Sequence, residues 1–158
     1  ILNVAYDSST FDTAPFEPQA DGVETIFPFW VEDKDNPGGG YVELPYTLPQ
    51  DFYTFIILQQ DKPDAWKRKL DWIASKGGMA LLITHPDYMW FGSGKRGFQE
   101  YPIQIYEEFL DYVKTNYADQ YWHALPKEVA AYYKEQQNKA KPSGFQLTQQ
   151  LNQVYAAE

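Results

Sequence analysis

The fold class expected for this chain rests on residues Met79–Tyr88, MALLITHPDY. A continuous apolar run follows the Gly77-Gly78 break and ends abruptly in a histidine, a proline and an acid. Runs of this kind are typical of a strand that is buried on both faces, as in a parallel sheet. In such sheets, residues at the carboxyl ends of the strands face the crevice where ligands bind. We therefore expect His85 to lie at a ligand-facing strand end.

Two interpretations of His85 follow from its position. It is one of two histidines in the chain, and histidine is the side chain whose unperturbed pKa lies nearest neutrality. A role in proton transfer is the functional interpretation. The alternative is a structural histidine that is hydrogen-bonded to a neighbouring carbonyl at a strand edge. Position alone leaves both open.

Composition excludes several classes of protein. At 158 residues the chain suits one domain with a sizeable core. Lys and Arg number 13 against 22 Asp and Glu, a net charge of −9, which disfavours nucleic-acid or anionic-membrane partners. The absence of cysteine excludes disulfides, a thiolate nucleophile and cysteine metal sites. No stretch has the length of a membrane span and no secretory signal is visible, so the compartment stays open.

Helices and strands are expected to alternate in the second half of the chain. A helix is predicted from Asp61 to Gly77, because one apolar stripe is formed by Trp66, Leu70, Ile73 and Ala74. The remaining predicted elements are a strand over 79–84, a helix over 103–117, a short strand over 121–125 and a helix over 127–138. This succession predicts an α/β fold with parallel strands.

The first half is predicted to be more irregular. Strands are expected over 1–6, 26–31 and 41–45, and prolines make the second and third of them edge or irregular strands. The stretch 52–58 is apolar but of ambiguous type. Because the first strand has no lead-in, we expect that a longer polypeptide has lost its amino-terminal part.

Four stretches carry a resemblance to a known family: Tyr6–Asp12 (YDSSTFD), Leu44–Pro49 (LPYTLP), Leu81–Asp87 (LLITHPD) and Tyr121–Pro126 (YWHALP). Their order resembles the carboxyl-terminal half of the polysaccharide deacetylase (NodB-like) domain. The resemblance implies that residues 1–140 are the C-terminal portion of a distorted (β/α) barrel with parallel strands. Residues 141–158 are then a tail with a short closing helix.

The family resemblance implies a metal-dependent hydrolase that removes acetyl groups from N-acetylated sugars or a related amide. In the family a divalent metal, often zinc, activates the water, and an aspartate with two histidines in an HxxxH arrangement holds it. This chain has no HxxxH, since His85 and His123 are its histidines. We therefore expect that this chain holds no metal site and is inactive alone. The metal ligands are expected to come from a missing N-terminal half or from another chain. The alternatives are a non-catalytic carbohydrate-binding or scaffolding member of the same fold, and an unrelated α/β domain.

Two catalytic candidates follow from the resemblance. His85 matches the family histidine that protonates the leaving amine, a general-acid role. Asp7 matches the acid that ends a strand and orients a charged group from the missing half. The structural alternative for Asp7 is a turn-forming side chain.

Three residues are candidates for substrate binding. Ile83 shares a face with His85 by the two-residue period of a strand, and the matching family position lines the pocket for the acetyl methyl group. Tyr88 and Trp90 follow His85 into a glycine-rich loop, where their rings are placed to stack on a sugar. A core role is the alternative for Trp90.

Overall fold

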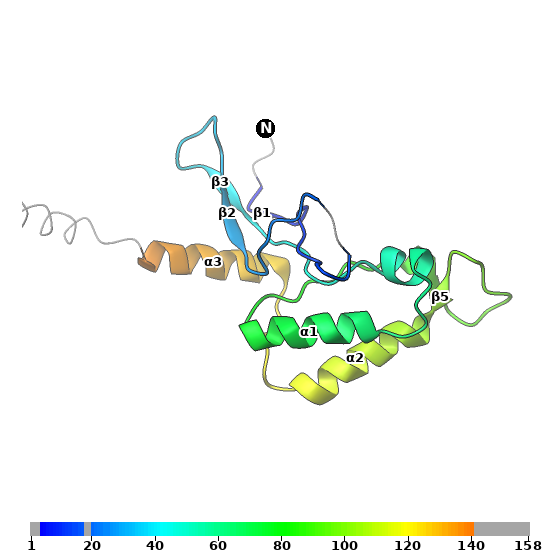
Figure 1. Cartoon of the computed structure of the whole chain (residues 1–158). Coiled ribbons are helices and arrows are strands. Elements are labelled where there is room, and N and C mark those ends of the chain that lie inside the picture. Colours follow the sequence, from blue (N-terminus) through cyan, green and yellow to red (C-terminus); the bar gives the residue numbers. More distant parts are fainter. Residues whose placement is uncertain (1–3, 18–19, 141–158) are drawn as a thin grey trace, which may run out of the picture.

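The computed structural model describes residues 4–17 and 20–140, which form a mixed α/β structure (Figure 1). Its helices are α1 (Asp64–Lys76), α2 (Ile103–Tyr117) and α3 (Pro126–Ala140), with a π-helix η1 (Phe52–Ile57) and a 3₁₀-turn η2 (Pro86–Tyr88). One sheet holds β1 (Tyr6–Asp7), β3 (Gly40–Glu43) and β2 (Phe29–Glu32), and a second pairs β4 (Met89–Trp90) with β5 (Tyr101–Pro102). These strands close no barrel within the described ranges.

The first sheet has the order β1-β3-β2, so β1 and β2 are its edges. β2 and β3 form an antiparallel hairpin, whereas β1 runs parallel to β3 with Tyr6 opposite Val42. Gly40 has a φ of 144°, and a Cβ there would lie 2.2 Å from the Val31 carbonyl oxygen. Only glycine therefore lets the two hairpin strands approach this closely.

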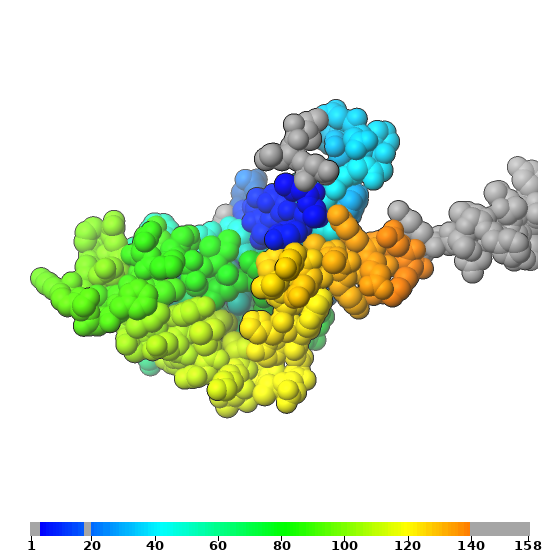
Figure 2. Space-filling model, turned by 180° about the vertical axis from the view of Figure 1, so that it is seen from behind, coloured from blue at the N-terminus to red at the C-terminus, as the bar shows by residue number. Residues whose placement is uncertain are grey.

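Helix α3 covers β1 and β3, and Ala130 packs with the buried Val42 and Leu44 of the sheet region. Figure 2 shows from behind that α3, in yellow to orange, lies against the blue N-terminal residues. No helix in the described part of the chain combines the length and the apolar character needed to cross a membrane.

The main core lies between α1, α2 and η1, with α1 and α2 side by side (Figure 1). Trp66 is fully buried at its centre, where its ring lies 4.8 Å from that of Phe55 and 5.2 Å from that of Phe109. Its indole N–H donates to the Pro49 carbonyl at 2.6 Å. This bond satisfies the polar atom of the ring, as burial of a tryptophan requires.

The predicted helices over 61–77, 103–117 and 127–138 are confirmed as α1, α2 and α3, which begin and end within a few residues of their expected bounds. Of the expected stripe, Trp66, Leu70 and Ile73 are buried in α1, whereas Ala74 is exposed. Gly77, with a φ of 66°, ends the helix in the left-handed conformation that glycine adopts without strain.

The predicted strand over 79–84 is wrong in two respects: the segment joins no strand ladder, and Leu81–Thr84 are only half-buried. It does run beside the buried segment 44–49, but a side chain takes part in the pairing. The Thr47 hydroxyl donates to the Met79 carbonyl and accepts from the Leu81 N–H. The Leu81 carbonyl accepts from the N–H groups of both Thr47 and Leu48. Pro45 and Pro49 lack N–H donors, which prevents a regular ladder on that side.

Other predictions need correction in detail. Residues 121–125, predicted as a strand, form an irregular linker to α3. The strand expected over 1–6 is the two-residue β1, and residues 1–3 lie outside the described part. The tail 141–158 with its closing helix also lies outside the described residues. The coarse α/β prediction holds, although the β2–β3 pairing is antiparallel rather than parallel.

Two tyrosines join α2 to α1. The hydroxyls of Tyr112 and Tyr117 both donate to the carboxylate of Asp71, at 2.8 and 2.6 Å. The bond to Asp71 raises the pKa of Tyr117 to about 12, with a smaller contribution from burial. The same bond raises the pKa of Tyr112.

We expect Trp66→Ala to lower the free energy of unfolding by about 3–5 kcal/mol, because it removes a buried ring and leaves a cavity. Denaturant unfolding measures the loss. Trp122→Ala is the matched control, since Trp122 is 58% exposed, and should cost about 1 kcal/mol or less. Equal losses for the two variants would contradict the placement of Trp66 at the centre of the core.

The Asp71 contact predicts a loss of stability at alkaline pH. The folded pKa of Tyr117, about 12, lies above the ordinary value of 10.0, so the folded state holds this proton more tightly than the unfolded state. The stabilisation is therefore complete below pH of about 10 and disappears as the pH rises through about 12. In urea unfolding, Tyr117→Phe should be less stable than the wild type at pH 8, and the difference should shrink toward pH 12. A difference that is independent of pH would count against this.

Candidate acid–base site

The site is built around Asp51, a fully buried carboxylate. The buried segment 44–49 leads directly to it, and the residue precedes the first turn of η1. Its Oδ1 atom accepts a hydrogen bond from the Phe52 N–H at 2.8 Å. An aspartate suits this position because its side chain satisfies an N–H group at a helix start.

His85 is bound to Asp51 at two points. Its backbone N–H donates to Oδ2 at 2.6 Å, and its ring Nδ1 lies 2.7 Å from Oδ1. An ionised carboxylate only accepts hydrogen bonds, so Nδ1 carries the proton of this contact. The His85 side chain is 40% exposed while that of Asp51 is 0% exposed. The ring is thus held by its Nδ1 edge, and the edge that carries Nε2 faces outward.

Tyr101 supplies the fourth hydrogen bond to Asp51. Its hydroxyl donates to Oδ2 at 3.2 Å, and the residue is 2% exposed. Burial raises the pKa of Tyr101, and the negative charge of Asp51 raises it further. The hydroxyl therefore stays protonated at neutral pH and is available as a donor to Asp51.

Tyr88 is the predicted site residue that the structure places beside His85. Its ring centroid lies 5.2 Å from that of His85 and 5.2 Å from that of Phe52. Ile83 is half-buried two residues before His85 in the extended segment. Trp90 lies in β4, where its indole N–H donates to the Ser93 carbonyl at 3.1 Å and thereby folds the start of the following loop.

Asp7 lies in β1 of the three-stranded sheet, and its carboxylate accepts hydrogen bonds from the turn that follows. Its Oδ1 accepts from the Ser8 N–H and its Oδ2 from the Ser9 hydroxyl, both at 2.9 Å. The same turn is held from β3 by the buried Glu43, which accepts from Ser9 and Thr10. In the described part of the chain, no hydrogen bond or ion pair joins Asp7 to His85. The family role of Asp7 stays a prediction.

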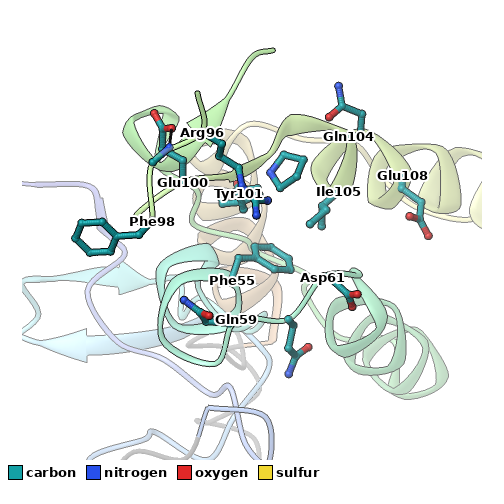
Figure 3. Close-up of a pocket in the computed structure, with 13 residues that line it drawn as sticks. Phe55, Gln59, Asp61, Arg96, Phe98, Glu100, Tyr101, Gln104, Ile105 and Glu108 are labelled. Carbon is teal, nitrogen blue, oxygen red and sulfur yellow. Dashed lines mark hydrogen bonds between the residues drawn. The ribbon is translucent and has the colours of Figure 1, made fainter. Parts of the chain in front are cut away.

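Tyr101 also lines a cavity of about 560 Å³ (Figure 3). The end of η1, the loop before β5 and the first turns of α2 surround it. Phe55 and Tyr101 lie next to each other in its wall, with ring centroids 4.6 Å apart. The amide of Gln59 and the guanidinium of Arg96 supply polar groups. Gln59 has a φ of 50°, a left-handed conformation that is rare outside glycine.

The described residues do not fit a catalytic metal centre. Within 4–17 and 20–140, no three His, Asp or Glu side chains gather closely enough to hold an ion. A catalytic zinc site needs three protein ligands.

Comparisons of the chain with protein-family models, with curated proteins and with solved structures give no match. The NodB-like resemblance therefore stays a prediction, as do the roles of His85, Asp7, Ile83, Tyr88 and Trp90 within it.

Sequence reasoning missed Asp51 and Tyr101. A signal for Asp51 was available, because an acid directly before an apolar run is typical of a helix start. Tyr101 has no such local signal. It lies 50 residues from Asp51 in the sequence, and an isolated tyrosine among 13 does not reveal a partner so distant.

We expect Asp51→Asn to change the tautomer of the His85 ring. Asparagine has one acceptor oxygen, so its amide nitrogen must face donors on one side of the group. In ¹⁵N–¹H spectra of the neutral ring, the wild type should show mainly the form protonated on Nδ1, and the variant should lose this preference. His123 provides an internal reference, and Asp7→Asn is the matched control. An unchanged His85 spectrum in Asp51→Asn would contradict the geometry of the pair.

Proposed function

We propose that Asp51 and His85 are the proton-transfer centre of a hydrolase that acts on amide bonds. The observation that carries this proposal is the buried carboxylate that holds a half-exposed imidazole through Nδ1 at 2.7 Å. A buried aspartate in this position fixes the tautomer and orientation of a catalytic histidine and stabilises the imidazolium. The outward Nε2 is then the atom that exchanges protons with a substrate.

The proposed step is general-acid catalysis. The imidazolium of His85 donates its Nε2 proton to the leaving amine nitrogen as the carbon–nitrogen bond breaks, and the ring becomes neutral. Asp51 stabilises the charged ring before the transfer and keeps it aimed at the substrate afterwards. Proton transfer of this kind contributes about 10²–10⁴-fold to the rate.

The proposed substrate class is an N-acetylated amino sugar or a related small amide. Tyr88 supports this proposal because its ring lies beside His85, where an aromatic face is available to stack on a sugar ring. Ile83 is the candidate for the pocket of the acetyl methyl group, and Trp90 is a second aromatic candidate. The divalent metal that activates water in the family, often zinc, would be held by residues outside this chain.

We also propose that the chain is the C-terminal portion of a distorted (β/α) barrel. Supporting this, β1 and β2 each have one edge that pairs with no strand in the described ranges. Such edges are open to further strands. A missing N-terminal half or another chain is the proposed source of those strands and of the metal ligands.

A non-catalytic carbohydrate-binding role is the second candidate. Phe91 and Phe98 favour it, because they are 65% and 83% exposed on the loop that follows β4. Exposed aromatic rings on a loop are typical of binding surfaces. This role needs no proton-transfer centre.

Replacement of His85 by alanine in the complete, metal-loaded polypeptide should lower kcat by about 10²-fold or more and leave KM nearly unchanged. Release of acetate from N-acetylglucosamine oligomers measures this. The matched control is His123→Ala, which should keep full turnover. Full turnover in His85→Ala would overturn the catalytic proposal, whereas binding of the oligomers without acetate release in the wild type would favour the binding role.

A further inference from the structure

Tyr101 is connected to His85 in two ways, through the β4–β5 pairing and through Asp51. The turn after His85 leads into β4, and Met89 in β4 pairs with Tyr101 in β5. From there the Tyr101 hydroxyl reaches Asp51, and Asp51 binds His85 at two atoms. The β4–β5 pairing and the side-chain contacts thus both link Tyr101 to His85.

With the Tyr101 hydroxyl in place, each carboxylate oxygen of Asp51 accepts two hydrogen bonds. Oδ1 accepts from Phe52 and from the His85 ring, whereas Oδ2 accepts from the His85 backbone and from Tyr101. Without the hydroxyl, Oδ2 would keep one donor and be left partly unsatisfied in a buried site. A buried acceptor in that state costs free energy and favours rotation of the carboxylate toward other partners.

The ring of Tyr101 is itself held in place. It lies 4.6 Å from the Phe55 ring, and Phe55 in turn packs edge-on against Trp66 at 4.8 Å. This packing belongs to the main core and does not depend on the hydroxyl. Removal of the oxygen alone therefore separates the polar role of Tyr101 from its packing role.

We propose that Tyr101 is a positioning residue, which acts on His85 through Asp51 and keeps the imidazole aimed with Nε2 outward. The expected effect on turnover rests on the proposed function, whereas the positioning of the His85 ring does not depend on any reaction. Tyr101 touches no substrate in this scheme.

The test is Tyr101→Phe in the chain as it exists, read by NMR on the His85 ring. The Nδ1 proton of His85 should exchange with water about tenfold faster than in the wild type, the scale of one hydrogen bond to a charged group. Tyr112→Phe is the matched control, because it removes the same kind of contact, a tyrosine hydroxyl on an aspartate, between α2 and α1. It should leave the His85 signals unchanged.

An unchanged His85 exchange rate in a folded Tyr101→Phe protein would overturn the proposal, as would an equal change in Tyr112→Phe. If Tyr101→Phe does not fold, the wild type decides: a slowly exchanging tyrosine hydroxyl proton with a nuclear Overhauser effect to the His85 amide supports the proposal, and its absence overturns it. In the complete polypeptide, Tyr101→Phe should lower kcat about tenfold at unchanged KM. A wild type without turnover refutes the proposed function and leaves the exchange result to decide the positioning role.

Discussion

The buried carboxylate of Asp51 is the constraint on which the arrangement of this protein depends. Moving an ionised carboxylate out of water costs several kcal/mol unless hydrogen bonds replace the lost hydration. Here the donors come from the start of η1, from the segment that ends in His85 and from β5. Displacement of any of these three segments would remove a hydrogen bond from the buried charge. The contacts with Asp51 therefore fix the positions of the three segments relative to one another.

The segment 44–49 connects this point to the rest of the molecule. It continues from β3, which packs under α3, and reaches Asp51 while it passes the extended run 79–84. The Thr47 hydroxyl binds that run by donating to the Met79 carbonyl and accepting from the Leu81 N–H. The Pro49 carbonyl accepts a hydrogen bond from the indole N–H of Trp66. The two apolar clusters of the described residues are therefore joined by one buried stretch of chain, and the candidate site lies where that stretch ends.

Local patterns predicted the helices and singled out His85, but they missed its contacts with Asp51 and the part of Tyr101 in the site. The stripe of Trp66, Leu70 and Ile73 has the period of an α-helix, so α1 could be predicted from the sequence alone. The stretch 52–58 was ambiguous because η1 is a π-helix, in which Leu58 donates to the Tyr53 carbonyl and side chains follow neither the helical nor the strand period. The run 79–84 has the composition of a strand, yet Thr47 and two prolines on the neighbouring segment determine its hydrogen bonding. Asp51 and Tyr101 gain their meaning from contacts between segments, which no local pattern carries.

The connection between β4 and β5 has a consequence for variation in length. Residues 91–100 leave β4 and return to β5, which runs parallel to it, and Phe98 at 83% exposure marks the outer part of this loop. The entropy of closing a loop grows only slowly with its length, by about 0.6 kcal/mol for each doubling. Insertions at the tip thus leave the pairing of Met89 with Tyr101 almost untouched, so the loop is free to vary in length while His85 keeps its contacts with Asp51.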